Sequence, residues 1–316
     1  MNSLTTRIFA TDAFGLKAAA SILTQGGLVA FPTETVYGLG VDARKTDAVA
    51  RLYAAKGRPS FNPLIAHVAS IEIAEKLVVF DDIARNLAQA FWPGALTLVL
   101  PLKSNAGISP LVTAGLETLA VRVPDHPVAA GLLGAFGGPI AAPSANPSGQ
   151  VSPTSMIHVT DHMTGVIDGV VDGGACNVGV ESTIVATQPT PTLLRAGGVP
   201  AEAIAQAIGG DLARIGESAA PSSPGQLASH YAPNGAVRLN AETIDDGETL
   251  LGFGDVQAAV NLSKSGDLVE AASRLFDALH QLNAMGAERI AVSPIPEYGL
   301  GAAINDRLRR AAAPRT

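Results

Sequence analysis

The sequence predicts an α/β protein of two domains, a large one over residues 1–208 and a smaller one over residues 236–316. Short apolar runs alternate with helical patterns along most of the chain, as in mixed α/β sheets. The 316 residues are about twice the usual size of one domain. Residues 209–235 lack periodicity and contain three prolines, which is typical of a linker between domains.

In the large domain, expected helices and strands alternate. Residues 12–25 are expected to be helical because Asp12 can cap the start and Gly26 and Gly27 can end the helix. Further helices are expected at residues 47–55, 81–91 and 128–136. Strands are expected at the short apolar runs 28–31, 64–68, 95–100, 119–123, 139–142, 166–171 and 183–187.

The smaller domain shows the same alternation. Strands are expected at residues 249–253, 258–262 and 289–293, and a helix at residues 267–285, whose leucines fall on roughly one face. A final helix is expected at residues 300–312, with Arg307, Arg309 and Arg310 in its last turns, where the helix dipole favours cations. This order predicts a small Rossmann-like α/β domain.

Composition excludes several classes of protein. Hydrophobic residues make up 47% of the chain, which is enough for packed cores, and the net charge of −7 argues against a generally basic nucleic-acid binder. A single cysteine, Cys176, excludes a disulfide framework, a cysteine zinc finger and an iron–sulfur site, and suits a reducing cytoplasm.

No secretory or membrane segment is expected. The first residues are polar and lack the apolar core of a secretory signal. Residues 126–160 carry no Asp, Glu, Lys or Arg, but five prolines leave no room for a helix of about 20 residues. We therefore expect a cytoplasmic protein without a membrane span.

Four familiar motifs for nucleotide, nucleophile and metal sites are absent or incomplete. Residues 38–43 match G-x-G-x-x-A, but polar residues interrupt the approach, and no acidic residue follows at the distance a dinucleotide site needs. The chain contains neither a phosphate-binding P-loop motif nor G-x-S-x-G, and nothing marks Cys176 as a nucleophile. His158 and His162 have metal-compatible spacing but no third ligand, so no metal site is predicted.

Candidate ligand-binding residues lie on turns. Lys56 and Arg58 flank Gly57 at an expected helix end, where both cations can face one polyphosphate. Small polar side chains gather at strand ends in residues 31–40, 142–149 and 179–184. Such residues suit ordinary turns as well as a site for nucleotide hydroxyls, phosphates and an amino acid.

Seven blocks in order strongly resemble the threonylcarbamoyl-AMP synthase family. They are Pro32-Thr33-Glu34-Thr35-Val36-Tyr37-Gly38-Leu39, Lys56-Gly57-Arg58-Pro59, Asn62-Pro63-Leu64, Trp92-Pro93-Gly94, Arg122-Val123-Pro124, Pro143-Ser144-Ala145-Asn146 and Glu181-Ser182-Thr183. The resemblance covers residues near 10–208. Ser223-Pro224-Gly225 and His230-Tyr231-Ala232-Pro233, followed by a small α/β domain, look like the family's two-domain form.

The resemblance implies a fold and a reaction. The large domain would be a YrdC-like twisted open sheet with a basic cavity. The enzyme would condense L-threonine, bicarbonate or carbon dioxide, and ATP to threonylcarbamoyl-adenylate and pyrophosphate. That product would pass to the tRNA threonylcarbamoyl-transfer machinery, which modifies adenosine 37. Mg²⁺ would be held mainly by ATP phosphates and water, since no acidic cluster forms an evident cage.

The resemblance also assigns roles to residues. The threonine site would contain Thr35, His67, Arg122, Ala142 (through its backbone) and Ser182. ATP would contact Arg58, Asn62, Thr118, Ser144, Asn146, Ser152, Arg195 and Tyr231. Lys56 and Arg58 would act in catalysis by neutralising the charge of the triphosphate.

Alternatives remain open at two of these residues. His67 could instead be a strand histidine bonded only to backbone groups. Residues 226–233 are predicted to cover the cavity, with Tyr231 on ATP, but Tyr231 could simply pack the seam between the domains.

Two other functions fit part of the sequence. An RNA-binding module could use Lys56, Arg58 and Arg122 on phosphates, yet the net charge of −7 predicts weak or absent RNA binding. A hydrogenase-maturing carbamoyltransferase uses a related domain but also carries cysteine-rich zinc modules, which a single cysteine excludes.

Overall fold

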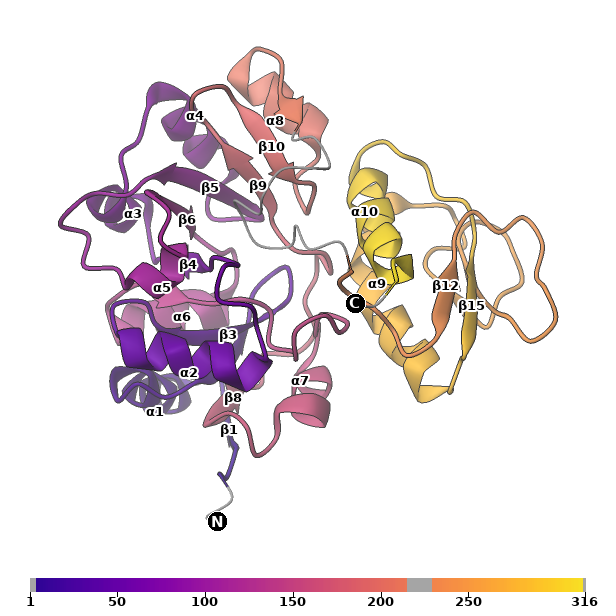
Figure 1. Ribbon diagram of the computed structural model, residues 1–316, viewed down its shortest axis with the longest axis horizontal. Helices are drawn as coiled ribbons and strands as arrows, with labels where there is room; N and C mark the ends of the chain where they lie inside the picture. Colours follow the sequence, from indigo (N-terminus) through magenta and orange to yellow (C-terminus); the bar gives the residue numbers. More distant parts are fainter. Residues whose placement is uncertain (1–3, 215–228, 315–316) are drawn as a thin grey trace.

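The computed structural model describes residues 4–214 and 229–314. Their strands form two sheets, one of eleven strands and one of four, each with its own helices (Figure 1). The predicted α/β fold with two domains is confirmed. The exact boundaries remain predictions, and the large sheet continues past residue 208, because β11 (Ala213–Arg214) pairs in parallel with β10 (Thr192–Arg195).

The large sheet is mixed and mostly buried. Its strand order is β1-β8-β2-β3-β7-β4-β6-β5-β9-β10-β11. The remaining strands are β1 (Arg7–Phe9), β2 (Val29–Pro32), β3 (Tyr37–Asp42), β4 (Ile65–His67), β5 (Leu96–Pro101), β6 (Thr118–Arg122), β7 (Ile140–Ala141), β8 (Gly169–Val171) and β9 (Thr183–Ala186). Parallel strands β4 and β6 lie side by side near the middle, and their ends reach the site described below.

The predicted helices of the large domain are present. In α1 (Ala13–Thr24), the Asp12 side chain accepts a hydrogen bond from the backbone N–H of Gly15. Helix α2 (Thr46–Lys56) ends at Gly57, whose φ of 59° is left-handed and favours glycine. The other helices are α3 (Ile71–Leu77), α4 (Asp82–Phe91), α5 (Pro110–Thr113), α6 (Pro127–Phe136), α7 (Met156–Met163) and α8 (Ala201–Ile208).

Strand β3 contains the glycines of the false dinucleotide motif. It runs antiparallel to β2, so Gly38 and Gly40 lie in a sheet and not in a loop that opens a helix. A Cβ atom on Gly40 would lie 2.8 Å from Phe31 Cε1 and 2.9 Å from Ile140 Cγ2. These glycines therefore allow neighbouring side chains to pack across the strand.

The small domain has a parallel sheet of order β12-β15-β13-β14. Its elements are β12 (Ala236–Arg238), β13 (Thr249–Gly252), β14 (Val260–Asn261), α9 (Leu268–Ala284), β15 (Arg289–Val292) and α10 (Leu300–Ala312). Both helices lie on the side of this sheet that faces the large domain (Figure 1). The small domain therefore presents helices to its neighbour.

The two domains are in close contact. A Cβ atom on Gly179 would lie 2.4 Å from the Ala272 carbonyl oxygen of α9, so only glycine allows this approach. The His158 ring of α7 stacks on the His280 ring of α9 with centroids 3.9 Å apart. Across the described parts of the chain, no helix is both long and apolar enough to cross a membrane.

Candidate functional site

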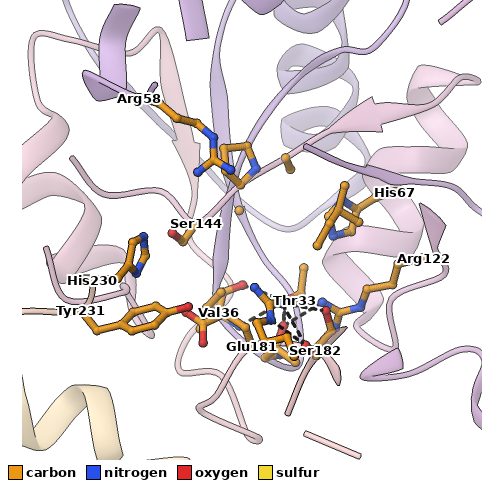
Figure 2. A pocket seen from close by; sticks show the side chains of 16 residues that line it. Thr33, Val36, Arg58, His67, Arg122, Ser144, Glu181, Ser182, His230 and Tyr231 are labelled. Carbon is orange, nitrogen blue, oxygen red and sulfur yellow. Dashed lines mark hydrogen bonds between the residues drawn. The ribbon is translucent and has the colours of Figure 1, made fainter. Parts of the chain in front are cut away.

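A pocket that is partly open to solvent lies in the large domain at its border with the small domain. Figure 2 shows His67 and Arg122 on one side of the pocket, and His230 and Tyr231 on the other. Its lining comprises Thr33, Thr35, Val36, Gly38, Arg58, Ile65, His67, Arg122, Ala142, Pro143, Ser144, Glu181, Ser182, Arg195, His230 and Tyr231.

Arg122 anchors one end of the pocket. It is the last residue of β6 and is buried, with 3% of its surface exposed. Its Nε donates to the Gly94 carbonyl (3.1 Å), and its Nη1 donates to Thr35 Oγ1 (2.9 Å). Its Nη2 lies 2.5 Å from Glu34 Oε1, an ion-pair contact that lacks the alignment of a hydrogen bond. These contacts fix the planar guanidinium, which pairs well with a carboxylate.

His67 stands beside Arg122 because β4 and β6 pair in parallel with these two residues in register. Its ring is buried, and its Nδ1 has no hydrogen-bond partner in the described structure. Burial, together with the nearby Arg122 charge, lowers the pKa of His67 to about 3. The imidazole is therefore neutral at pH 7 and can accept a hydrogen bond from a ligand.

Ser182 and Arg195 form the floor of the pocket. Arg195 ends β10, which pairs antiparallel with β9, and Ser182 comes just before β9. Arg195 donates from Nε (3.1 Å) and Nη2 (2.9 Å) to the Ser182 carbonyl oxygen. The Ser182 hydroxyl also lies 2.7 Å from the Thr97 hydroxyl. A cation and a hydroxyl are thus held beside each other at the sheet surface.

Arg58 lines the pocket, whereas Lys56 lies behind its wall. Arg58 donates from Nη2 to the Pro63 carbonyl (2.9 Å), and burial lowers its pKa to about 10. The buried Lys56 ammonium donates to the carbonyl oxygens of Ser144 (2.6 Å) and Asn146. Burial, then the charge of Arg58, lowers the Lys56 pKa well below its usual value. Lys56 therefore holds the 144–146 turn in place.

His230 and Tyr231 close the opposite side of the pocket. Tyr231 is buried, with a φ of 61°, which is an unfavourable backbone conformation for an aromatic residue. Its ring also packs on Phe276 of α9, with centroids 5.5 Å apart. Tyr231 thus packs the seam between the domains and also lines the cavity, while its contact with ATP remains a prediction. The first part of the linker, including Ser223-Pro224-Gly225, lies outside the described residues.

Comparison with known proteins adds an independent line of evidence. Residues 21–197 match a family model described as "Telomere recombination", and residues 199–313 match one described as "Threonylcarbamoyl-AMP synthase, C-terminal domain". The threonylcarbamoyl-AMP synthase of Bacillus subtilis is 42% identical over 94% of this chain and 92% of its own length. The chain belongs to the threonylcarbamoyl-AMP synthase family.

Solved structures of this family have the same architecture. The crystal structure of Pyrococcus abyssi Sua5 complexed with L-threonine matches with a TM-score of 0.89 and 38% sequence identity, over 97% of this chain and 98% of that one. Some family members are shorter. The threonylcarbamoyl-AMP synthase of Halorhodospira halophila is 47% identical over 47% of this chain but 78% of its own length.

The structure brings many of the residues predicted from the family resemblance into one pocket. Those that line it are Thr35, Arg58, His67, Arg122, Ala142, Ser144, Ser182, Arg195 and Tyr231. Those outside its lining are Lys56, Asn62, Thr118, Asn146 and Ser152. Asn62 and Asn146 nevertheless retain side-chain atoms that are buried without a hydrogen-bond partner in the described structure. Their roles remain predictions.

Several residues that line the pocket were not among the predicted site residues. Glu181 and Thr33 belong to the family blocks, and His230 precedes Tyr231 in the linker motif, so position in those motifs was the available signal. Pro143 also belongs to a family block, whereas Ile65 belongs to none and contributes only apolar surface.

The charge of the pocket suits an anionic ligand. Three guanidinium groups line it, those of Arg58, Arg122 and Arg195, against the carboxylate of Glu181 in the lining and that of Glu34, which contacts Arg122. The described residues therefore form the basic cavity expected for this family. Within residues 4–214 and 229–314, no three His, Cys, Asp or Glu side chains gather as a metal site.

Proposed function

We propose that this pocket condenses L-threonine, bicarbonate or carbon dioxide, and ATP to threonylcarbamoyl-adenylate and pyrophosphate. The observation that carries the proposal is a buried arginine fork at one end of a pocket whose other walls hold two further arginines. An amino acid needs the first feature and a polyphosphate needs the second. Family membership supports the same reaction.

Threonine would bind at the Arg122 end. Its carboxylate would pair with the Arg122 guanidinium, whose orientation Thr35 and Gly94 fix. The neutral His67 ring offers a buried acceptor for a threonine N–H or O–H group. Ser182 would add a hydroxyl, and Ala142 can offer only backbone groups. Fixed partners of this kind favour a reactive orientation of the amine.

The chemistry would proceed in two steps. The threonine amine attacks carbon dioxide, a C–N bond forms, and the nitrogen loses one proton to give a carbamate. Starting from bicarbonate, a C–O bond also breaks, and the departing hydroxide takes up that proton and leaves as water. A carbamate oxygen then attacks the α-phosphorus of ATP, the bond to the bridging oxygen of the β-phosphate breaks, and pyrophosphate leaves. Arg58 and Arg195 would stabilise the negative charge that develops on the phosphates.

The nucleotide would occupy the side nearer Ser144 and Tyr231. Arg58 and Arg195 face that side from separate elements, and Tyr231 would cover the adenylate and exclude water from it. Lys56 would act through the 144–146 turn that it holds, in addition to its charge. Contacts from Asn62, Thr118, Asn146 and Ser152 would need movement of the pocket wall on ATP binding.

A divalent cation fits this donor set only through ATP. The pocket lining has one carboxylate, Glu181, and that group is already paired. We propose that Mg²⁺ would be held mainly by phosphate oxygens and water, as is usual for this ion. When bound, it would neutralise phosphate charge. The protein's own arginines would do the positioning.

The product and its surroundings are part of the proposal. Threonylcarbamoyl-adenylate would be consumed by the machinery that modifies adenosine 37 of tRNA, in the cytoplasm. Direct RNA binding has less support, because Lys56 and Arg122 are buried and face the interior.

The reaction is tested by mass spectrometry and by pyrophosphate release. Purified protein with ATP, Mg²⁺, threonine and bicarbonate should form threonylcarbamoyl-adenylate, and omission of either threonine or bicarbonate should abolish pyrophosphate release. Equal pyrophosphate release without threonine would reduce the activity to general ATP hydrolysis and contradict the proposal.

A further inference from the structure

Arg307 is a fully buried arginine that reaches out of the small domain. From its place in the last turns of α10, the sequence predicts only a cation that the helix dipole favours, but 0% of it is exposed. Its Nε donates to Glu181 Oε2 at 2.8 Å, and its Nη1 donates to the Ala196 carbonyl at 2.8 Å. Both partners belong to the large domain, so Arg307 bridges the two domains.

Glu181 connects this bridge to the pocket. Its side chain lines the cavity, and its second oxygen, Oε1, accepts a hydrogen bond of 2.6 Å from the Ser152 hydroxyl. Burial would raise the pKa of Glu181, but the charges of Arg307 and Arg195 outweigh it and lower the pKa. The carboxylate is therefore charged, and Arg307 and Ser152 hold it from two sides.

Tyr231 and Arg195 are held at the same place. The Arg307 guanidinium lies 5.3 Å from the centre of the Tyr231 ring, on its face. Ala196, whose carbonyl accepts from Arg307, directly follows Arg195 in the chain. One side chain of α10 thus contacts three parts of the pocket wall, namely residue 181, the strand end at 195–196 and the linker at 231.

Burial of the Arg307 guanidinium costs free energy unless its ion pair and hydrogen bonds are all formed. A guanidinium taken fully out of water must recover its hydration through an ion pair and hydrogen bonds, and removal of one partner leaves a lone buried charge. The shorter family member from Halorhodospira halophila spans only about half of this chain. In this chain, the arginine that pairs with Glu181 comes from the small domain.

We propose that Arg307 is a positioning residue through which the small domain holds the nucleotide side of the pocket in its binding geometry. It acts through Glu181, Tyr231 and the backbone beside Arg195. This inference rests on the ATP contacts proposed above. Arg307 is not bonded to Arg122 or His67, which are held by the large domain alone.

The test compares Arg307→Lys with Arg309→Ala in the full-length protein. Lysine keeps the charge but lacks the fork that reaches both Glu181 and Ala196. Arg309 is a matched control on the same helix, with an exposed ion pair to Glu297. In Arg307→Lys, we expect the KM for ATP to rise at least tenfold and the KM for threonine to change less than threefold. Arg309→Ala should leave both unchanged.

A purely structural role would give a different result. It would lower the melting temperature of Arg307→Lys but leave both KM values within threefold of wild type well below that temperature. Because a lone charge could prevent folding, a second variant combines Glu181→Gln with Arg307→Met and leaves no buried charge in the pair. A tenfold rise in its KM for ATP supports the proposal, and an unchanged value overturns it.

Arg195→Ala separates this inference from the nucleotide assignment. A raised KM for ATP in Arg195→Ala with an unchanged value in Arg307→Lys overturns the role of Arg307 alone. An unchanged KM for ATP in both variants overturns that role together with the proposed ATP contacts.

Discussion

The two sides of the pocket are built in different ways. On the side of Arg122 and His67, each functional group sits at a strand end of one sheet, and its partners lie in the large domain (Figure 2). On the side of Tyr231, the wall combines the large domain, the linker and α10 of the small domain. One side is complete within a single domain, whereas the other is assembled from two.

Because of this difference, we expect the binding free energies of threonine and of ATP to depend on different parts of the molecule. Threonine binding should depend on local strand geometry and be almost independent of how the domains dock. Nucleotide binding should favour the docked arrangement, and by reciprocity, docking should favour nucleotide binding. Each prediction below either breaks this separation or makes it sharper.

The largest effect is expected from Arg122→Ala. Loss of a charge-assisted bidentate pair costs roughly 1.5–3 kcal/mol, so threonine affinity should fall about tenfold or more. ATP affinity should change much less, because Arg122 lies on the other side of the pocket. Calorimetry with each ligand checks both values. Unchanged threonine affinity in a folded variant would contradict the assignment.

A smaller effect is expected from Lys56→Met. The ammonium donates to the Ser144 and Asn146 carbonyls, and its loss leaves two buried acceptors unpaired. The free energy of unfolding should fall by roughly 2 kcal/mol, as measured by urea denaturation. The KM for ATP should rise more than that for threonine, since the 144–146 turn belongs to the nucleotide side. Equal increases in both would contradict this division.

The smallest effect concerns pH and the histidines at the domain interface. His280 faces His158, His162 and Asp277, and mainly burial, with help from the His158 charge, lowers its pKa to about 4. Because the unfolded chain binds this proton near pH 6.5 and the folded chain does not, His280 costs nothing above pH 6.5 and lowers stability as the pH falls towards 4.

His280→Gln should therefore lose less stability than wild type between pH 7 and pH 5. Urea midpoints at both pH values check this, and the comparison cancels the contributions of other buried histidines. An identical pH dependence in the two proteins would show that the interface does not resist protonation of His280.

Sequence patterns predicted the elements whose local signals are strong. The helix predicted over residues 12–25 is α1 (Ala13–Thr24), since a capping aspartate and two glycines mark its ends. Strand β3 was missed because Gly38 and Gly40 weaken any strand pattern, and the reason for Gly40 is a contact with Phe31 and Ile140 that only the fold reveals. Strand β12 lacks buried residues and gave no apolar signal.

The two sides of the pocket also differ in how well the sequence predicted their residues. Arg122 and Thr35 lie within family blocks, and the family resemblance also implied His67, which stands beside Arg122 because β4 and β6 are neighbours. Arg307 was not predicted as a site residue, because in sequence it is one of three arginines near a helix end, and only burial distinguishes it from Arg309. A contact between residues 126 positions apart leaves no local pattern.

Hydrogen exchange of the wild-type protein tests the central claim most directly. Full-length protein would be measured alone, with threonine, and with ATP and Mg²⁺, and protection followed by mass spectrometry. ATP should slow exchange in peptides covering residues 229–233 and α10, while threonine should slow exchange only around β4, β6 and the turn that carries Thr35. Equal protection of α10 by threonine, or no protection of α10 by ATP, would contradict a nucleotide side shared by two domains.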